Sequence, residues 1–282
     1  MREKRIVYLF SFFICPSSGY ALEEAYVEND SLSQVLLGQI EATDSIETEI
    51  RLLQELGLHY MEIAPDKVEF VAADILDISK RADYSKGVAT GYNLLGLFEE
   101  QKGNYPTAVE HYLKTIEHFE QERDFRSAAY VQRNLAGCYQ YLGENEKAIE
   151  ALENSLSTFV EMKDTTGQAY AYNILGNVYE EMGNGPKAVD CHSMCYEFAT
   201  YLSDHSLMAI SSLNVANNMD YIANYNEVMG RLSNALQAFK AMGNLKGEAI
   251  TYNNFGSVEL ENKKNGSAIN YLNKSIKLTK EI

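Results

Sequence analysis

The sequence contains few residues that interrupt helices. Only four prolines occur among its 282 residues, and no short segments bounded by glycine and proline, which are typical of strands, are present. Leu, Ala, Glu and Lys, which favour helices, are abundant outside the expected loops. This composition excludes a fold rich in strands and predicts an all-α protein.

Cysteine is also scarce. Of the four cysteines, Cys15 lies near the N-terminus, and Cys138, Cys191 and Cys195 are spread over the rest of the chain. Small exported domains that depend on disulfides have many cysteines, which are usually even in number. The three cysteines outside the N-terminal part are too few, and odd in number, and therefore do not indicate a disulfide framework.

Motifs that carry catalysis are absent from the sequence. There is no glycine-rich phosphate loop, no Gly-x-Ser-x-Gly turn, no His-Glu-x-x-His and no paired-acid motif. The carboxylates are numerous and regularly spaced, so none is distinguished as an acid or a base. We expect neither enzymatic activity nor a cofactor.

Basic residues are outnumbered, with 24 Lys and Arg against 40 Asp and Glu, which gives a net charge of −16. This acidity argues against nucleic acid or an anionic lipid surface as the partner and favours a basic or neutral peptide. The excess charge is also compatible with a solvated outer face that has no partner.

The sequence has only one long apolar run, which lies close to the N-terminus. The basic start MREKR is followed by the ten apolar residues IVYLFSFFIC and by PSSGYA, with Gly19 and Ala21 at a candidate cleavage site. This layout predicts a signal peptide over residues 1–21, and the alternative is an uncleaved membrane anchor. We expect an exported protein of the periplasm or cell envelope that does not insert into the membrane after cleavage.

A repeat of forty residues organises most of the chain. Small residues recur at this spacing in two columns, seven residues apart: Gly96, Ala136, Gly176, Ala216 and Gly256, preceded by Ala89, Ala129, Ala169, Ala209 and Ala249. A fixed period of this length indicates stacked units that bury their apolar faces against their neighbours. The chain is therefore expected to be a scaffold.

Other columns of the repeat specify the unit. The segment LLGLFEEQKGNYPTA places Gly103, Tyr105 and Ala108 after Gly96, and LAGCYQYLGENEKA and LGNVYEEMGNGPKA repeat the pattern up to Ala148 and Ala188. Later copies, which end at Val228 and Ala268, are looser. In these residues the chain resembles the tetratricopeptide repeat family, in a form longer than the usual unit of about 34 residues.

The resemblance implies an all-α, right-handed superhelical solenoid of stacked antiparallel helical hairpins. The small columns allow the paired helices to approach closely, with Ala108, Ala148, Ala188 and Ala268 as facing residues. Gly103, Gly143 and Gly183 end the first helices in the left-handed conformation. Pro106 and Pro186 lie in the first turn of the second helices.

The repeats divide the chain after the signal peptide. Residues 22–43 form a lead segment with a helix over residues 31–42, and residues 44–282 form the array. The expected repeats are 44–87, 88–127, 128–167, 168–207, 208–247 and 248–282. The first repeat lacks the glycine and tyrosine columns, as a terminal capping repeat does. In it, Asp44 or Ser45 caps one helix, and Pro65 and Asp66 open a second helix with the apolar residues Phe70, Ala73, Ile75 and Ile78.

The beginning of the chain is similar to the exported tetratricopeptide regions of bacterial sensor proteins. In such proteins a membrane helix and a signalling module follow the array. Here the array continues to Ile282, so we expect either a C-terminal output module or an open end covered by a partner or a second copy. The leading interpretation is a sensory or adaptor part of a signal-transduction protein, and the alternative is a structural assembly subunit that stacks on itself through its last repeat.

By resemblance, the first helices of such hairpins line a concave groove that binds an extended peptide. Asparagine offers donors and an acceptor to a peptide backbone. The expected groove residues are Asn93, Arg133, Asn173, Asn177, Asn217 and Asn253, with Tyr130 and Tyr170 near enough to stack on a ligand. Asparagines at this spacing also suit hydrogen bonds between repeats, which would stabilise the stack instead.

One segment, DCHSMC, contains residue types that bind metals. Cys191 and Cys195 lie one helical turn apart, with His192 between them. The repeat places Cys195 in a column of small residues and His192 in a packing column that holds Tyr112, Leu152, Leu232 and Leu272. We therefore interpret both cysteines and the histidine as packing residues and expect no metal site.

Overall fold

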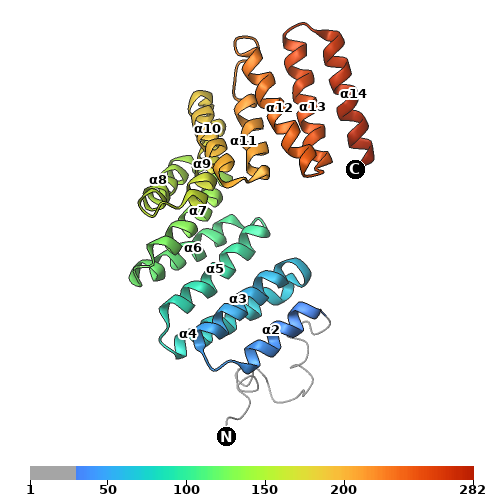
Figure 1. Ribbon diagram of the computed structural model, residues 1–282. Helices are drawn as coiled ribbons and strands as arrows, with labels where there is room; N and C mark the ends of the chain where they lie inside the picture. The colour runs from blue at the N-terminus through green and yellow to red at the C-terminus, as the bar shows by residue number, and fades with distance from the viewer. Residues whose placement is uncertain (1–29) are drawn as a thin grey trace. The chain divides into compact units, whose positions relative to one another are not determined.

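The computed structural model describes residues 30–282. Within them the chain forms thirteen α-helices and one 3-10 helix, with no strand (Figure 1). This confirms the predicted all-α class. The predicted signal peptide, residues 1–21, lies outside the described residues, as does the start of the lead segment.

The helices fall into two compact units, Met1–Gly143 and Glu144–Ile282. The first contains α2 (Ser31–Ala42), α3 (Ile46–Ile63), η1 (Pro65–Lys67), α4 (Val68–Arg81), α5 (Ser85–Gln101), α6 (Tyr105–Gln121) and α7 (Phe125–Tyr141). The second contains α8 (Asn145–Glu161), α9 (Thr165–Glu181), α10 (Gly185–Leu202), α11 (His205–Asn217), α12 (Tyr225–Ala241), α13 (Leu245–Glu261) and α14 (Asn265–Glu281). The period of the sequence continues through this boundary without a break.

The start of each helix follows the repeat. From α5 at Ser85 to α14 at Asn265, every helix begins twenty residues after the one before it. Two helices therefore make one forty-residue unit, as the sequence predicted. Within the units, α5 packs on α6, α9 on α10, α11 on α12 and α13 on α14. The hairpins begin three residues earlier than the expected repeats, at residue 85 rather than 88.

Left-handed residues end the helices at the same interval. Gly103, Gly143 and Gly183 have φ values of 75°, 73° and 71°, which confirms their predicted role. The turns after second helices carry the same conformation at Asp83, Arg123, Lys163, Ser203 and Gly243. A second periodic signal follows one residue later, where Asp124, Asp164, Asp204 and Asn244 cap the next helix by accepting a backbone N–H.

The two helices of a hairpin are in close contact at the small-residue column. A Cβ atom on Gly96 would lie 2.6 Å from the Tyr112 ring, and one on Gly176 would lie 2.5 Å from the His192 ring. A Cβ on Gly256 would lie 2.7 Å from Leu272. The predicted facing alanines are buried, but the nearest group is the larger side chain four residues further on. The glycine therefore makes room for that side chain.

The N-terminal part of the array also follows the prediction closely. The predicted helix over residues 31–42 is α2, and Ser45 caps α3 by accepting from the Thr48 N–H at 3.3 Å. Pro65 opens η1, which leads directly into α4. The expected apolar stripe of α4 was partly wrong, because Phe70 and Ala73 are exposed. The core is formed instead by Val68, Val71, Ala72, Ile75 and Ile78.

The cysteines and the histidine of the DCHSMC segment lie on the buried face of α10. Cys191, His192 and Cys195 are all buried, and neither ring nitrogen of His192 has a hydrogen-bond partner. Burial raises the pKa of Cys191 to about 11 and that of Cys195 to about 12, so both thiols stay protonated. Burial also lowers the pKa of His192 to about 4. The neutral imidazole occupies the place that leucine fills in neighbouring repeats.

Replacing His192 with leucine is expected to remove an acid-sensitive contribution to stability. The folded pKa of about 4 lies below the ordinary value of 6.5, so the unfolded chain binds a proton first as the pH falls. Between pH 6.5 and 4 this difference lowers the free energy of unfolding by about 3 kcal/mol. Urea denaturation followed by circular dichroism should show the native chain losing this amount relative to His192→Leu. The exposed His205→Ala is the control, and equal losses in the native chain and His192→Leu would contradict the account.

Candidate functional site

The predicted groove residues lie on first helices in both units. Asn93 lies on α5, and Tyr130 and Arg133 lie on α7 of the first unit. The second unit carries the other five, Tyr170, Asn173 and Asn177 on α9, Asn217 on α11 and Asn253 on α13. The forty-residue period places most of them in equivalent helical positions. Each unit therefore presents its own set of candidate residues.

Hydrogen bonds between repeats engage two of the predicted asparagines. The side chain of Asn214 donates to Asn177 Oδ1 at 3.5 Å, and Asn254 donates to Asn217 Oδ1 at 2.6 Å. Both bonds join a first helix to the first helix of the next repeat, 37 residues along the chain. This is the stabilising arrangement that the sequence left open as an alternative. The side-chain oxygens of Asn177 and Asn217 are thus already engaged in the stack, and a bound peptide would have to share or replace these hydrogen bonds.

The remaining predicted asparagines differ from this pair. Oδ1 of Asn93 and Oδ1 of Asn173 are buried and accept no hydrogen bond within the described residues. Asn253 is exposed on α13. A buried amide oxygen without a donor costs roughly 1–3 kcal/mol, so burial in the stack does not by itself account for these side chains. Within the described residues, Asn93 and Asn173 thus keep an acceptor without a donor and Asn253 is open to solvent, which distinguishes them from the paired Asn177 and Asn217.

Among the first helices of the second unit, α9, α11 and α13, the middle one departs from the repeat. It ends at Asn217, whereas the other first helices from α5 onward extend to the position equivalent to residue 221. Asp220, which is equivalent to Glu100 and Glu180 in the repeat, lies in the following turn and accepts hydrogen bonds from the N–H groups of Ile222 and Ala223. Asn218 connects this turn to α9 by donating to Glu180 Oε2 at 3.1 Å. The predicted helical column is therefore interrupted here.

The two predicted tyrosines are held by neighbouring side chains. The Tyr170 hydroxyl donates to Asp204 Oδ2 at 3.1 Å, which ties α9 to the cap of α11. The Arg133 guanidinium lies 5.2 Å from the centre of the Tyr130 ring and donates to Asn134 Oδ1 at 3.1 Å. The structure thus brings Tyr130 and Arg133 together on α7. The hydroxyl of Tyr170 serves the contact between repeats.

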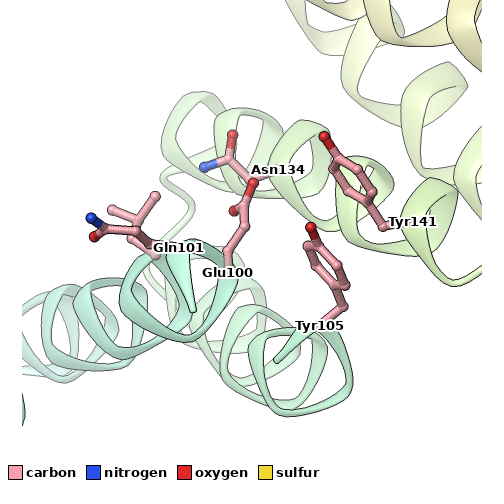
Figure 2. A pocket seen from close by; sticks show the side chains of 6 residues that line it. Glu100, Gln101, Tyr105, Asn134 and Tyr141 are labelled. Carbon is pink, nitrogen blue, oxygen red and sulfur yellow. The ribbon is translucent and has the colours of Figure 1, made fainter. Parts of the chain in front are cut away.

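A pocket of about 340 Å³ opens on the first unit, between the C-terminal parts of α5 and α7 and the start of α6 (Figure 2). Its lining residues are Leu97, Glu100, Gln101, Tyr105, Asn134 and Tyr141. The rings of Tyr105 and Tyr141 stack with their centres 4.6 Å apart and their planes 5° from parallel. Figure 2 shows the Glu100 carboxylate beside Asn134, with the two tyrosines forming the neighbouring wall.

Glu100 determines the charge of this pocket. Its Oε2 accepts a hydrogen bond from the Tyr112 hydroxyl, which comes from α6. Burial raises the pKa of Glu100, and the Tyr112 hydrogen bond and the charge of Arg133 oppose that rise. Gln101 donates from its side chain to the Met61 carbonyl oxygen at 3.2 Å. The pocket therefore combines a partly buried carboxylate with amides and phenols.

The sequence did not identify this pocket. Leu97 shares a column with the predicted groove residues Asn177 and Asn217, and Asn134 follows Arg133 on α7. Tyr141 was missed because its column alternates between tyrosine, at 141 and 221, and Gln101, Glu181 and Glu261, and therefore has no single residue type in every repeat. Tyr105 recurs in the family pattern, but that pattern gives no sign that its ring borders a pocket.

Within residues 30–282, no group of three or more His, Cys, Asp or Glu side chains is arranged to hold a metal ion. No helix in this part of the chain combines the length and the apolar character needed to cross a bilayer.

The Asn217 and Asn254 side chains should be coupled in stability. We expect a double-mutant cycle with Asn217→Ala and Asn254→Ala to give a coupling free energy of about 0.5–1.5 kcal/mol, measured by urea denaturation. The Asn177 and Asn214 pair, with its longer contact of 3.5 Å, is the control and should couple more weakly. Additive effects at Asn217 and Asn254 would show that their hydrogen bond does not stabilise the stack.

Comparison with known proteins identifies the repeat. The tetratricopeptide repeat family matches residues 87–159 and residues 249–282. The first match contains α6 and α7 and most of α5 and α8, and the second contains α14 and most of α13. No curated protein matches the sequence.

Solved structures share the fold at low sequence identity. The apo form of RapI is 16% identical with a TM-score of 0.72, and 88% of this chain covers 69% of that protein. A signal transduction ATPase with a tetratricopeptide repeat sensor, PH0952 from Pyrococcus horikoshii, is 16% identical with a TM-score of 0.69, and 86% of this chain covers 38% of it.

The apo form of the quorum sensor NprR from B. thuringiensis is 16% identical with a TM-score of 0.68, and 88% of this chain covers 70% of it. At these identities the likeness concerns the fold alone. The forty-residue helical hairpins, the matched segments and these shared folds agree. The chain is a tetratricopeptide repeat protein.

Proposed function

We propose that the chain is a non-enzymatic scaffold in which the first helices of each unit bind an extended peptide or protein segment. The residues proposed to contact a ligand are Asn93, Tyr130 and Arg133 in the first unit, and Tyr170, Asn173 and Asn253 in the second. Asn177 and Asn217 would contribute through the pairs that they form with the next repeat. No cofactor is required for this activity.

The proposal depends on a difference between the predicted asparagines: some form hydrogen bonds between repeats and others do not. Asn177 and Asn217 share one column of the repeat and accept hydrogen bonds within the stack. Asn93, Asn173 and Asn253 share another column, in which the oxygens of Asn93 and Asn173 accept no hydrogen bond within the described residues and Asn253 is exposed. Hydrogen bonds between repeats therefore account for the first column and not for the second. An amide that offers both donors and an acceptor suits the backbone of an extended peptide.

The biological setting proposed is signalling at the cell envelope. Residues 1–21 have the layout of a signal peptide, and two proteins that share the fold are described as sensors, the repeat sensor of PH0952 and the quorum sensor NprR. We propose that this chain is likewise the sensory or adaptor part of a signalling protein. A net charge of −16 makes nucleic acid an unsuitable partner.

Replacing Asn173 and Asn253 together with alanine should weaken peptide binding. Peptides selected from a random nine-residue library on the purified native protein serve as probes, with affinity measured by fluorescence anisotropy. Loss of two amide contacts predicts about a tenfold or greater rise in Kd. Asn273→Ala, an exposed asparagine on the second helix α14, is the matched control. An unchanged Kd in the double variant, or selection of no binding peptide, would contradict the proposal.

A further inference from the structure

The pocket on the first unit has a chemical character of its own, which the proposed peptide site does not explain. It lies where α5 ends and α6 begins, and α7 closes its other side (Figure 2). Its volume of about 340 Å³ is near the lower end for small-molecule sites. The pocket is therefore large enough for one extended side chain but not for a folded segment.

Glu100 places a carboxylate in this pocket, and no basic group among residues 30–282 is in direct contact with it. Tyr112 donates to one of its oxygens, and Arg133 acts on it through charge rather than through a hydrogen bond. The guanidinium of Arg133 is instead directed to the Tyr130 ring and to Asn134 Oδ1. A carboxylate that is partly removed from water gains more from a bound cation than an exposed one does.

The tyrosine pair supplies a second element of cation recognition. Tyr105 and Tyr141 stack in parallel across α6 and α7, and the Tyr141 side chain is 68% exposed. Aromatic faces and phenol oxygens both attract ammonium and guanidinium groups. Leu97 adds an apolar surface to the lining, against which the methylene stem of a long basic side chain packs favourably.

We propose that this pocket binds one basic side chain of the ligand, a lysine or an arginine, with Glu100 as the charged partner and Tyr105 and Tyr141 as the aromatic wall. The net charge of −16 attracts such ligands over a longer range. The inference rests on the proposed peptide-binding function and adds a preference for a basic residue at one position of the peptide.

The pocket is tested separately from the rest of the peptide site by a probe that carries only the side chain. Nα-acetyl-lysine methylamide is titrated into 15N-labelled protein, and the side-chain amide signals of Gln101 and Asn134 are followed by NMR. We expect saturable shifts at both residues. Nα-acetyl-norleucine methylamide, which lacks the ammonium group, should bind about tenfold more weakly or not at all.

Two variants connect the effect to the pocket. Glu100→Gln should remove the preference for the lysine probe over the norleucine probe, and Tyr141→Ala, a change at an exposed side chain, should weaken lysine binding while the protein stays folded. Glu180→Gln is the matched control, because Glu180 occupies the same column eighty residues later and does not line the pocket. Its titration should match that of the native chain.

The outcomes separate this inference from the proposed function. Equal binding of the two probes, or a lysine preference that persists in both Glu100→Gln and Tyr141→Ala, would overturn the basic pocket even if library peptides still bind. A lysine preference that disappears in these variants supports the pocket. If library peptides then fail to bind, the extended peptide site is wrong and the pocket is a site for a small amine.

Discussion

The close approach of paired helices is the contact on which the rest of the structure depends. At Gly96, Gly176 and Gly256 the first helix presents no Cβ, and the Tyr112, His192 or Leu272 side chain of the second helix fills the space. A larger residue there would force a rearrangement that costs about 1–3 kcal/mol. This contact recurs every eighty residues, and the column holds Ala136 and Ala216 in between. It sets the same separation in each of these hairpins and, within the second unit, brings equivalent residues of the first helices into line.

The candidate binding surface follows from that alignment. Residues at equivalent positions meet between repeats, which is why Asn214 reaches Asn177 and Asn254 reaches Asn217. The same geometry leaves Asn93, Asn173 and Asn253 without such a partner. In the first unit the Tyr112 side chain, which packs on Gly96, also donates to Glu100 in the pocket. Packing and the proposed recognition would therefore depend on the same residues, as in a scaffold whose units form its binding surface.

The sequence predicted most of the fold because its signals are periodic. The small column, the left-handed glycines and the helix over residues 31–42 required only local patterns. Features that arise from side chains meeting across repeats were not predictable in this way, including the Asn217 and Asn254 pair, the early end of α11 and the stack of Tyr105 on Tyr141. Phe70 was placed in the core because an apolar residue at helical spacing resembles a buried one, although it is exposed.

Hydrogen–deuterium exchange with and without a selected peptide tests the central claim most directly, namely that the first helices form the binding surface. The account predicts slower exchange on peptide binding in α9, α11 and α13, with little change in α10, α12 and α14. Exposed Ile269 and Ile276 on α14 are the surface that self-stacking through the last repeat would use. Protection confined to α14 and dependent on protein concentration would favour that alternative, and protection of the second helices by peptide would contradict the account.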